Sequence, residues 1–531
     1  MAAHDYIIVG AGSAGCVLAN RLTEDPEVSV LLLEAGGKDR SINIKIPAAF
    51  ANQFHTKLDW DYATEPEPGC DGRRLYVPRG KSLGGLSSVN ARLYVRGRPL
   101  DYDLWERAGA TGWGWREVLP YFMRSEDNER GASEFHAAGG PLRVSEQRSP
   151  RPLNAELIAA SEAAGIPRTA DYNGPEQDGV CAFQVTQKNG RRWSAADAFL
   201  RPAMSRPNLA VQTGVHVLGL DLDGTRVRGV RIAGRRGAGR VELAAREVIL
   251  AAGAIGSPQL LMASGIGPAD HLREVGVAVR HDLPAVGRQL QDHPFVSVLW
   301  EVKDTDTLLG ADKPQHLLRW VLRRNGKLTS SAAEVGAFVR TRAGLAAADI
   351  QLHMGALYYE AHGAEEFDGH AAVIAPALIS PQARGSITLR SSDPTVAPKI
   401  LTNALTEPDD LASLLAGMKL AREIAAEQPF AAKIVRELKP GAGASSAADL
   451  EADLRRRVEL IYHPVGTCRM GSGEDAVVDP ELRVRGIDGL RVIDASVMPL
   501  IPGGNTNAPT IMIAEKGADI VRGRTPLAAH A

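Results

Sequence analysis

The sequence predicts a mixed α/β fold, α+β overall, in which a parallel-sheet domain assembled from separated segments accompanies a second domain. Residues 5–34 read as strand, helix and strand, and both strands are nearly continuous apolar runs, as buried parallel strands require. Further buried strands are expected at 248–250 and 490–493. The stretches between these segments are less regularly punctuated, which indicates a second, mainly antiparallel sheet flanked by helices.

The two expected domains interleave along the chain. The first is expected to comprise residues 1–145, 205–290 and 455–531, with short alternating strands around 211–217, 227–232 and 241–243 and a closing helix at about 510–521. The second is expected to comprise residues 146–204 and 291–454, with strands at 372–374 and 385–389 and a helix at 409–427. One domain is therefore inserted into the other.

Composition excludes several function classes. A net charge of −2 over 531 residues offers no basic excess for nucleic acid. The four cysteines are scattered without metal-ligand spacing, so we expect neither a metal site nor a disulfide framework. The first residues lack signal-peptide features, and no apolar run reaches the roughly 18 residues of a spanning helix. We expect a cytoplasmic protein, with peripheral attachment at the inner face of the membrane left open.

The first strand runs into a glycine-rich turn of the Rossmann type. Gly10 permits the tight turn, Gly12 lets a pyrophosphate approach the backbone, and Gly15 lets the helix pack against the strand. Glu34 ends the next strand, where a ribose-binding carboxylate belongs, and it favours an unphosphorylated ribose. The motif alone fits NAD or FAD, but its place at the start of the chain, followed by Ala35, favours FAD.

Two further segments have the composition of cofactor-contacting loops. Residues 78–97 contain Gly84, Gly85 and Asn90 among small side chains, and such a loop can lie against a large flat cofactor. The alternative is an ordinary surface turn. Residues 251–258 end a buried strand, after which Ser257 is expected to cap a helix; this segment is equally well explained as purely structural.

His463 is the candidate base. Pro464 and Gly466 follow it and favour a defined irregular backbone, which suits a side chain that must be aimed. Asn507 lies in an Asn-rich loop that feeds the last helix, where it could act in the site, as an N-cap, or as both. The positive end of that helix could stabilise a reduced flavin. Asp494 ends the strand at 490–493, where parallel sheets meet their ligands, although a turn or cap role is equally reasonable.

Taken together, the chain resembles the glucose–methanol–choline (GMC) oxidoreductases over its whole length. The motifs that carry this resemblance occur in family order: VGAGSAG with EAG, PRGKSLGG, GAIGSPQLLMASGIGP, YHPVGTCRMG and VIDASVMPLIPGGNTNAPTIMIAEKGAD. Within the family, the chain is most similar to the bacterial branch that holds choline dehydrogenase and alkanol dehydrogenases.

The resemblance implies FAD as the cofactor and assigns roles to particular positions. It implies that His463 is the catalytic histidine and that Asn507 is its partner. The cofactor-binding residues it implies are Gly10, Gly12, Ser13, Gly15, Glu34 and Ala35 for the ADP part, Val217 for adenine, and Gly84, Gly85, Asn90, Asp494, Ala495, Asn505 and Thr506 for the pyrophosphate, ribityl chain and flavin. Leu86 departs from the family's small residue. Val89 replaces a histidine that bonds covalently to flavin in some members, so we expect non-covalent FAD.

The expected reaction is oxidation of a primary alcohol to the aldehyde. His463 would remove the hydroxyl proton while hydride passes to flavin N5, and Asn507 would orient the substrate oxygen. The electron acceptor, whether oxygen, a quinone or another carrier, is left open. The alternatives are a hydroxynitrile lyase on the same scaffold, a NAD-dependent dehydrogenase and a non-catalytic flavin module. Glu334 and Trp320 could serve a quaternary-ammonium substrate, but the low aromatic content favours a neutral alcohol.

Overall fold

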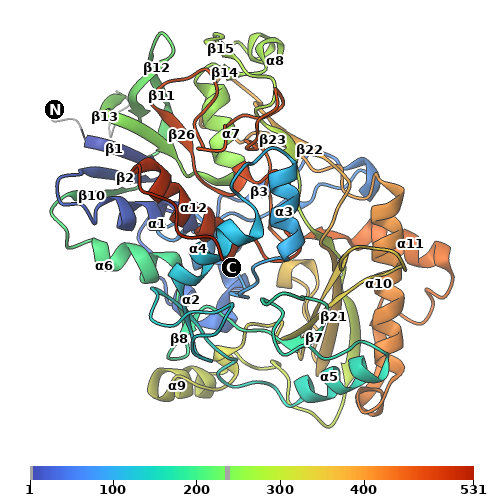
Figure 1. Cartoon of the computed structure of the whole chain (residues 1–531). Helices are drawn as coiled ribbons and strands as arrows, with labels where there is room; N and C mark the ends of the chain where they lie inside the picture. The colour runs from blue at the N-terminus through green and yellow to red at the C-terminus, as the bar shows by residue number, and fades with distance from the viewer. Residues whose placement is uncertain (1–3, 234–238, 531) are drawn as a thin grey trace.

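Two sheets organise the molecule, which the computed structural model describes over residues 4–233 and 239–530 (Figure 1). In the first sheet the strand order is β10-β2-β1-β13-β12-β11, with β26 also paired to β13. Its strands are β1 His4–Val9, β2 Val30–Glu34, β10 Leu209–Thr213, β11 Val217–Asp223, β12 Arg226–Ile232, β13 Arg240–Leu250 and β26 Leu490–Val492.

The parallel part of this sheet has the doubly wound order. Strands β10, β2, β1, β13 and β26 run parallel side by side, and in chain order they read 3-2-1-4-5. The α/β fold class is therefore confirmed. Residues 240–250 differ from the expectation of two separate strands, because they form the single strand β13. Its first half pairs antiparallel with β12 and its second half parallel with β1. No Gly or Pro interrupts residues 244–247, so nothing stops the strand there.

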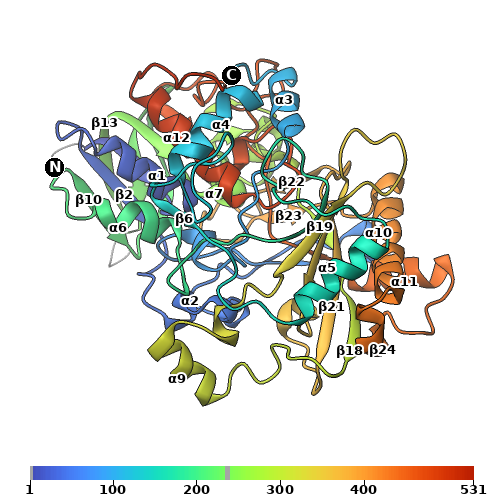
Figure 2. The same cartoon turned by 60° about the horizontal axis from the view of Figure 1, so that its bottom comes forward.

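The second sheet is antiparallel throughout, with the order β24-β18-β21-β20-β19-β7 and with β17 joining β21 to β25. Its strands are β7 Gly179–Ala182, β17 Pro294–Phe295, β18 Val298–Val302, β19 Val335–Val339, β20 Ile350–Gly355, β21 Ala371–Leu378, β24 Ile434–Lys439 and β25 Glu459–Leu460. Figure 2 shows it set apart from the first sheet, with α10 and α5 beside it. Strand β25 belongs to this second sheet, although its residues were assigned to the first domain. The domain boundaries stay a prediction.

Helices pack against the sheets and connect them. α1 packs against α12, and α12 packs against α4. α12 begins at Asn507, three residues before the expected start. The helices of nine or more residues are α1 Ser13–Leu22, α3 Pro99–Arg107, α4 Trp115–Ser125, α5 Leu153–Ala163, α7 Gly253–Ala263, α9 Pro314–Arg323, α10 Pro408–Ala426, α11 Ala447–Arg457 and α12 Asn507–Val521.

Candidate functional site

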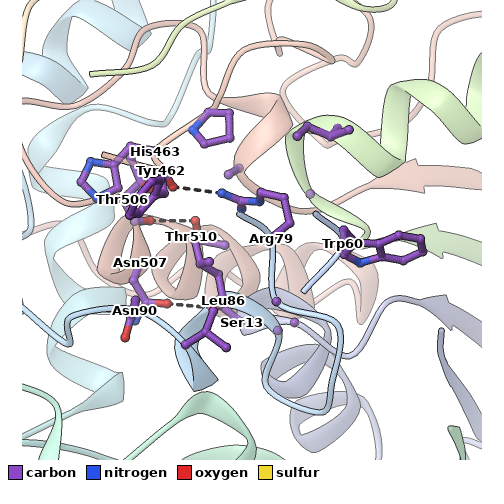
Figure 3. Close-up of a pocket in the computed structure, with 18 of the residues that line it drawn as sticks. Ser13, Trp60, Arg79, Leu86, Asn90, Tyr462, His463, Thr506, Asn507 and Thr510 are labelled. Carbon is purple, nitrogen blue, oxygen red and sulfur yellow. Dashed lines mark hydrogen bonds between the residues drawn. The ribbon is translucent and has the colours of Figure 1, made fainter. Parts of the chain in front are cut away.

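A pocket of about 320 Å³ lies where the parallel strands end. Figure 3 shows His463 on one side of it, Trp60 on the other and Arg79 between them. The residues expected in the site that line it are Gly10, Gly12, Ser13, Glu34, Ala35, Gly85, Asn90, Val217, His463, Asp494, Ala495, Asn505, Thr506 and Asn507. Gly15 and Gly84 support the lining rather than belonging to it.

Of the three glycines in the first glycine-rich turn, only Gly12 has open space beside it, as predicted for the approach of a pyrophosphate. A Cβ on Gly15 would meet the carbonyl oxygen of Gly10 at 1.9 Å, so Gly15 serves the close packing of α1 on β1. Gly10, at φ +102°, would bring a Cβ to 2.6 Å from the Ala251 oxygen. A Cβ on Gly12 would meet no atom within 4 Å. The turn is therefore packed on its protein side and open on its pocket side, which fits a bound pyrophosphate.

Glu34 closes this end of the pocket. Its carboxylate accepts hydrogen bonds from the backbone N–H of Ala11 (2.9 Å) and Gly36 (2.7 Å). Burial raises the pKa of Glu34 to about 7, although those two donors and Lys81 favour the ionised form. The carboxylate thus ties the first turn to the end of β2, and its further contact with a ribose stays a prediction.

An aromatic corner beside Val217 was not predicted. The Trp60 ring stacks on Tyr62 (5.8 Å between centroids) and meets His216 edge to face (5.6 Å), and all three residues line the pocket with Val217. Lys81 lies 4.3 Å from the centroid of the Trp60 ring. A flat apolar surface of this kind suits a nucleobase. This corner could not be predicted, because Trp60 belongs to no motif.

The second glycine-rich loop reaches the first by close backbone approach. Residues Gly85–Ser88 form a short 3-10 turn, and a Cβ on Gly85 would lie 2.7 Å from the Cα of Gly12. Gly84 supports the turn at φ +86° without lining the pocket. Leu86 and Val89 both line the pocket, so the two departures from the family pattern lie at its wall. The alternative of an ordinary surface turn does not describe this loop.

The Asp494 carboxylate accepts four hydrogen bonds from within the protein. One carboxylate oxygen accepts from Gly253 N–H (2.8 Å) and Ser257 Oγ (2.6 Å), and the other accepts from Ser496 N–H and Oγ. Ser257 therefore does not cap α7, which begins four residues earlier, at Gly253. The contact of Asp494 with cofactor hydroxyls stays a prediction, whereas its link between α7 and the end of β26 is visible.

The other end of the pocket is built from side chains. His463 Nε2 accepts a hydrogen bond from Asn505 Nδ2 (3.2 Å), and its Nδ1 lies 3.0 Å from Nδ1 of His293. Asn505 Oδ1 accepts in turn from Gln351 Nε2 (3.2 Å). The buried carboxylate of Asp292 accepts from the backbone N–H of both histidines, at 2.8 Å for His463 and 2.7 Å for His293. The imidazole is thus held at both ring nitrogens, and Asp292 holds the backbone of His463.

These contacts define the proton state of His463. An amide N–H can only donate, so Nε2 of His463 is unprotonated and Nδ1 carries the proton that it shares with His293. Burial lowers the pKa of His463 well below its ordinary value, and electrostatic effects lower it further, from His293, His353 and Arg79. The ring is therefore neutral at neutral pH, with a lone pair at Nε2, which is the state that a general base needs.

Asn505, rather than Asn507, hydrogen-bonds the His463 imidazole, and the catalytic partnership expected of Asn507 stays a prediction. Within the described residues no hydrogen bond joins Asn507 to the imidazole; its Oδ1 accepts from Ser13 Oγ (2.7 Å), as Figure 3 shows. The reason is the early start of α12, which makes Asn507 its first residue and turns it toward α1. Asn505, two residues earlier, stands in the loop that passes His463. His293, Asp292 and Gln351 were not predicted. For His293 and Asp292 the available signal was the Gln-Asp-His-Pro run at 291–294, which enters strand β17 at Pro294; Gln351 had none.

Two sources of positive potential face the middle of the pocket. Arg79 lines it and donates from Nη1 to the carbonyl oxygen of Tyr462 (2.9 Å; Figure 3). The first turn of α12 also lines it, at Asn507 and Thr510, and presents the positive end of the helix dipole. Negative charge that develops in this region would be stabilised.

Comparison with known proteins identifies the family. Models described as GMC oxidoreductase match residues 4–295 and 381–514. The alcohol dehydrogenase (acceptor) of Pseudomonas putida is 41% identical over 526 residues, covering 98% of this chain and 95% of that protein. Human mitochondrial choline dehydrogenase is 43% identical, covering 99% and 90%. The crystal structure of pyridoxine 4-oxidase from Mesorbium loti has a TM-score of 0.90 at 34% identity, covering 98% and 100%. The chain therefore belongs to the GMC oxidoreductase family of flavoproteins and is an oxidoreductase acting on CH–OH donors.

Proposed function

We propose that this protein oxidises a neutral, apolar primary alcohol to the aldehyde, with His463 as general base and FAD as cofactor. The observation that carries the proposal is the buried, neutral imidazole of His463. It lines the pocket, its Nδ1 is held by His293, and its Nε2 lone pair is met by a lone amide donor from Asn505. A substrate hydroxyl between Nε2 and Asn505 would find both an acceptor for its proton and a donor for its oxygen.

The residues of this chain would divide the work as follows. His463 Nε2 takes the hydroxyl proton, and Asn505 Nδ2 donates to the oxygen as its negative charge grows. His293 accepts from Nδ1–H before and after this transfer, so the ring keeps its orientation. FAD, when bound, supplies the acceptor for the hydride that leaves the carbon. Arg79 and the N-terminus of α12 would provide positive potential that stabilises the negative charge of the reduced flavin.

The cofactor would lie along the pocket from Glu34 to Asn505. Gly10, Gly12 and Ser13 would meet the pyrophosphate, and Trp60 and Val217 the adenine. Gly85, Ala495 and Thr506 would contact the ribityl chain and the flavin. Val89 lies in the pocket wall and has no atom that can bond covalently to flavin, so the proposed FAD is dissociable. The chain should release all of its flavin when it is denatured in acid, and flavin that remains on the polypeptide would contradict this part of the proposal.

The wall around His463 favours a neutral, apolar substrate. Phe295, Val373 and Ala375 form one apolar cluster with Leu357, Tyr359 and Ile461, and all six line the pocket. Among the described residues of the lining, the only carboxylates are Glu34 and Asp494, which are committed to backbone and serine donors. Glu334 accepts from Asn154 and Arg151, and Trp320 is buried on the inner face of α9; neither lines the pocket. A quaternary ammonium group would find no free carboxylate here.

Anaerobic mixing with alcohols tests the proposal. We expect 1-octanol and benzyl alcohol to bleach the flavin absorbance of the holoenzyme, and choline at the same concentration to bleach it at least about tenfold more slowly. A flavin that no alcohol bleaches would overturn the proposal and favour the hydroxynitrile-lyase alternative, which cleaves cyanohydrins without flavin reduction. Choline as the best substrate would overturn the substrate class alone. The family assignment supports FAD over the NAD-dependent alternative.

A further inference from the structure

Helix α9 (Pro314–Arg323) presents an uncovered apolar face to the outside. Leu317, Leu318, Val321 and Leu322 are exposed by 40%, 59%, 48% and 71%. Their spacing of one, three and one residues places them on one side of the helix. In Figures 1 and 2 α9 lies at the periphery of the molecule, away from the first sheet. Exposed leucines are normal one at a time, but four adjacent ones on one helix face mark a surface for an apolar partner.

The opposite face of α9 is firmly attached. Trp320 is 3% exposed, packs in an apolar cluster with Ile46, Ala49 and Leu328, and donates from Nε1 to the Gly190 oxygen (2.8 Å). Arg324 covers its ring at 4.1 Å from the centroid. The helix is thus fixed to the body by one side, and its apolar outer face cannot be buried by simple rotation.

Cations outnumber acidic residues around this face, although the exposed Asp312 directly precedes it. Residues 313–324 contain four cations, Lys313, Arg319, Arg323 and Arg324, and no acidic residue. The neighbouring hairpin of β8 (Gln187–Lys188) and β9 (Arg191–Arg192) adds exposed Lys188 and Arg191 beside Gly190. None of these six cations forms an ion pair with a carboxylate within residues 4–233 and 239–530. The whole chain carries a charge of −2, so this cationic rim is a local feature.

We propose that α9 docks this protein on the surface of an anionic phospholipid bilayer. The four apolar side chains would enter the boundary between headgroups and acyl chains, and the cations would meet lipid phosphates, as in other interfacial amphipathic helices. In the described part of the chain no helix is long and apolar enough to cross a membrane, so attachment would be to one face only. The inference is independent of the chemistry proposed above, because it uses none of the residues that contact the substrate.

The location also suits the proposed substrate class. Ala49, which packs under α9, precedes Phe50 in the chain, and Phe50 lines the pocket. A helix anchored in lipid would therefore hold one wall of an apolar pocket near the phase in which apolar alcohols concentrate. A protein partner would have to combine an apolar surface with an acidic rim, whereas an anionic bilayer presents both.

Vesicle flotation of the holoenzyme tests the proposal. Wild type should float with phosphatidylcholine vesicles that contain phosphatidylglycerol, and much less with phosphatidylcholine alone or in 0.5 M salt. Leu318→Gln/Leu322→Gln should lower partitioning by about tenfold or more, and Arg319→Gln/Arg323→Gln should remove the preference for the anionic lipid. The control Leu243→Gln/Val435→Gln alters two residues of similar exposure, 45% and 52%, on strands β13 and β24, and should float like wild type.

Three results would overturn the inference. The first is that wild type does not bind anionic vesicles. The second is that Leu318→Gln/Leu322→Gln floats as well as wild type. The third is that wild type binds no vesicles but is a dimer in light scattering, which Leu318→Gln/Leu322→Gln converts to monomers. Bleaching of the bound flavin by a water-soluble alcohol should be equal in all four proteins, which separates loss of docking from loss of folding or of the proposed chemistry.

Discussion

The two ends of the pocket are held in opposite ways. At the Gly12 end the wall is mainly backbone: a glycine-rich turn, closed by the Glu34 carboxylate and approached closely by a second glycine-rich turn at Gly85. At the His463 end the wall is side chains from four distant segments, joined in the chain Gln351–Asn505–His463–His293. A backbone wall accepts any ligand of the right shape and charge, whereas a chain of side chains fixes one proton on one atom. The first kind of wall suits holding a cofactor, and the second suits chemistry.

The largest effect should come from the side-chain end. His463→Ala should lower kcat by about 100- to 10,000-fold, the usual contribution of a general base, while FAD stays bound because the backbone end is untouched. Stopped-flow reduction of the flavin by alcohol measures this. His316→Ala is the control, since His316 lies on α9 outside the pocket. Turnover of His463→Ala within tenfold of wild type would refute the role of His463.

The partner residue gives the next largest effect and tests which asparagine acts. Asn505→Ala should lower kcat by about 10- to 100-fold, as expected for removal of a donor to a developing charge, with FAD affinity unchanged. Asn507→Ala should instead weaken FAD binding severalfold with a smaller change in kcat, because its bond is to Ser13. If Asn507→Ala lost turnover and Asn505→Ala did not, the contact between Asn505 and His463 would not be the catalytic one.

This difference shows what could be predicted from the sequence. The Gly10–Glu34 unit is contiguous, so its local pattern sufficed to place the turn and the carboxylate. His463 was found from its own neighbours, Pro464 and Gly466. Which asparagine hydrogen-bonds its ring could not be chosen in the same way, because Asn505 and Asn507 have the same local composition and only the start of α12 separates them. His293 lies 170 positions away from His463, and only tertiary packing brings them together. Strand β13 was wrongly predicted as two strands for a related reason. It pairs with β12 along its first half and with β1 along its second, and this change of partner leaves no mark in the sequence of β13 itself.

The backbone end can be broken without breaking the fold. Gly12→Ala should weaken FAD binding by about tenfold, because its methyl group would enter space that is open in the protein and that the pyrophosphate would need. The melting temperature of the FAD-free protein should not change. Gly15→Ala is the matched comparison: its Cβ would lie 1.9 Å from the Gly10 oxygen, so this variant should lose stability even without FAD. Flavin fluorescence titration and thermal melts separate the two. Equal melting losses in both variants would contradict the assignment of Gly12.

The smallest effect is expected from pH, and it probes the side-chain end alone. A histidine whose pKa is lowered stays neutral above that pKa and gains a proton only below it, so the base form of His463 persists on the acidic side of its ordinary value of about 6.5. The kcat/KM for a neutral alcohol should therefore be flat from pH 6.5 upward, and its acidic limb should fall at lower pH, measured while the bound flavin is monitored to exclude its release. A limb centred above pH 6.5 would mean that the imidazole is not buried and neutral when substrate arrives. His293→Gln then locates the cause: the glutamine amide could keep an acceptor for Nδ1–H but not the ring beside it, so it should shift the limb toward neutral pH and leave FAD affinity as it was.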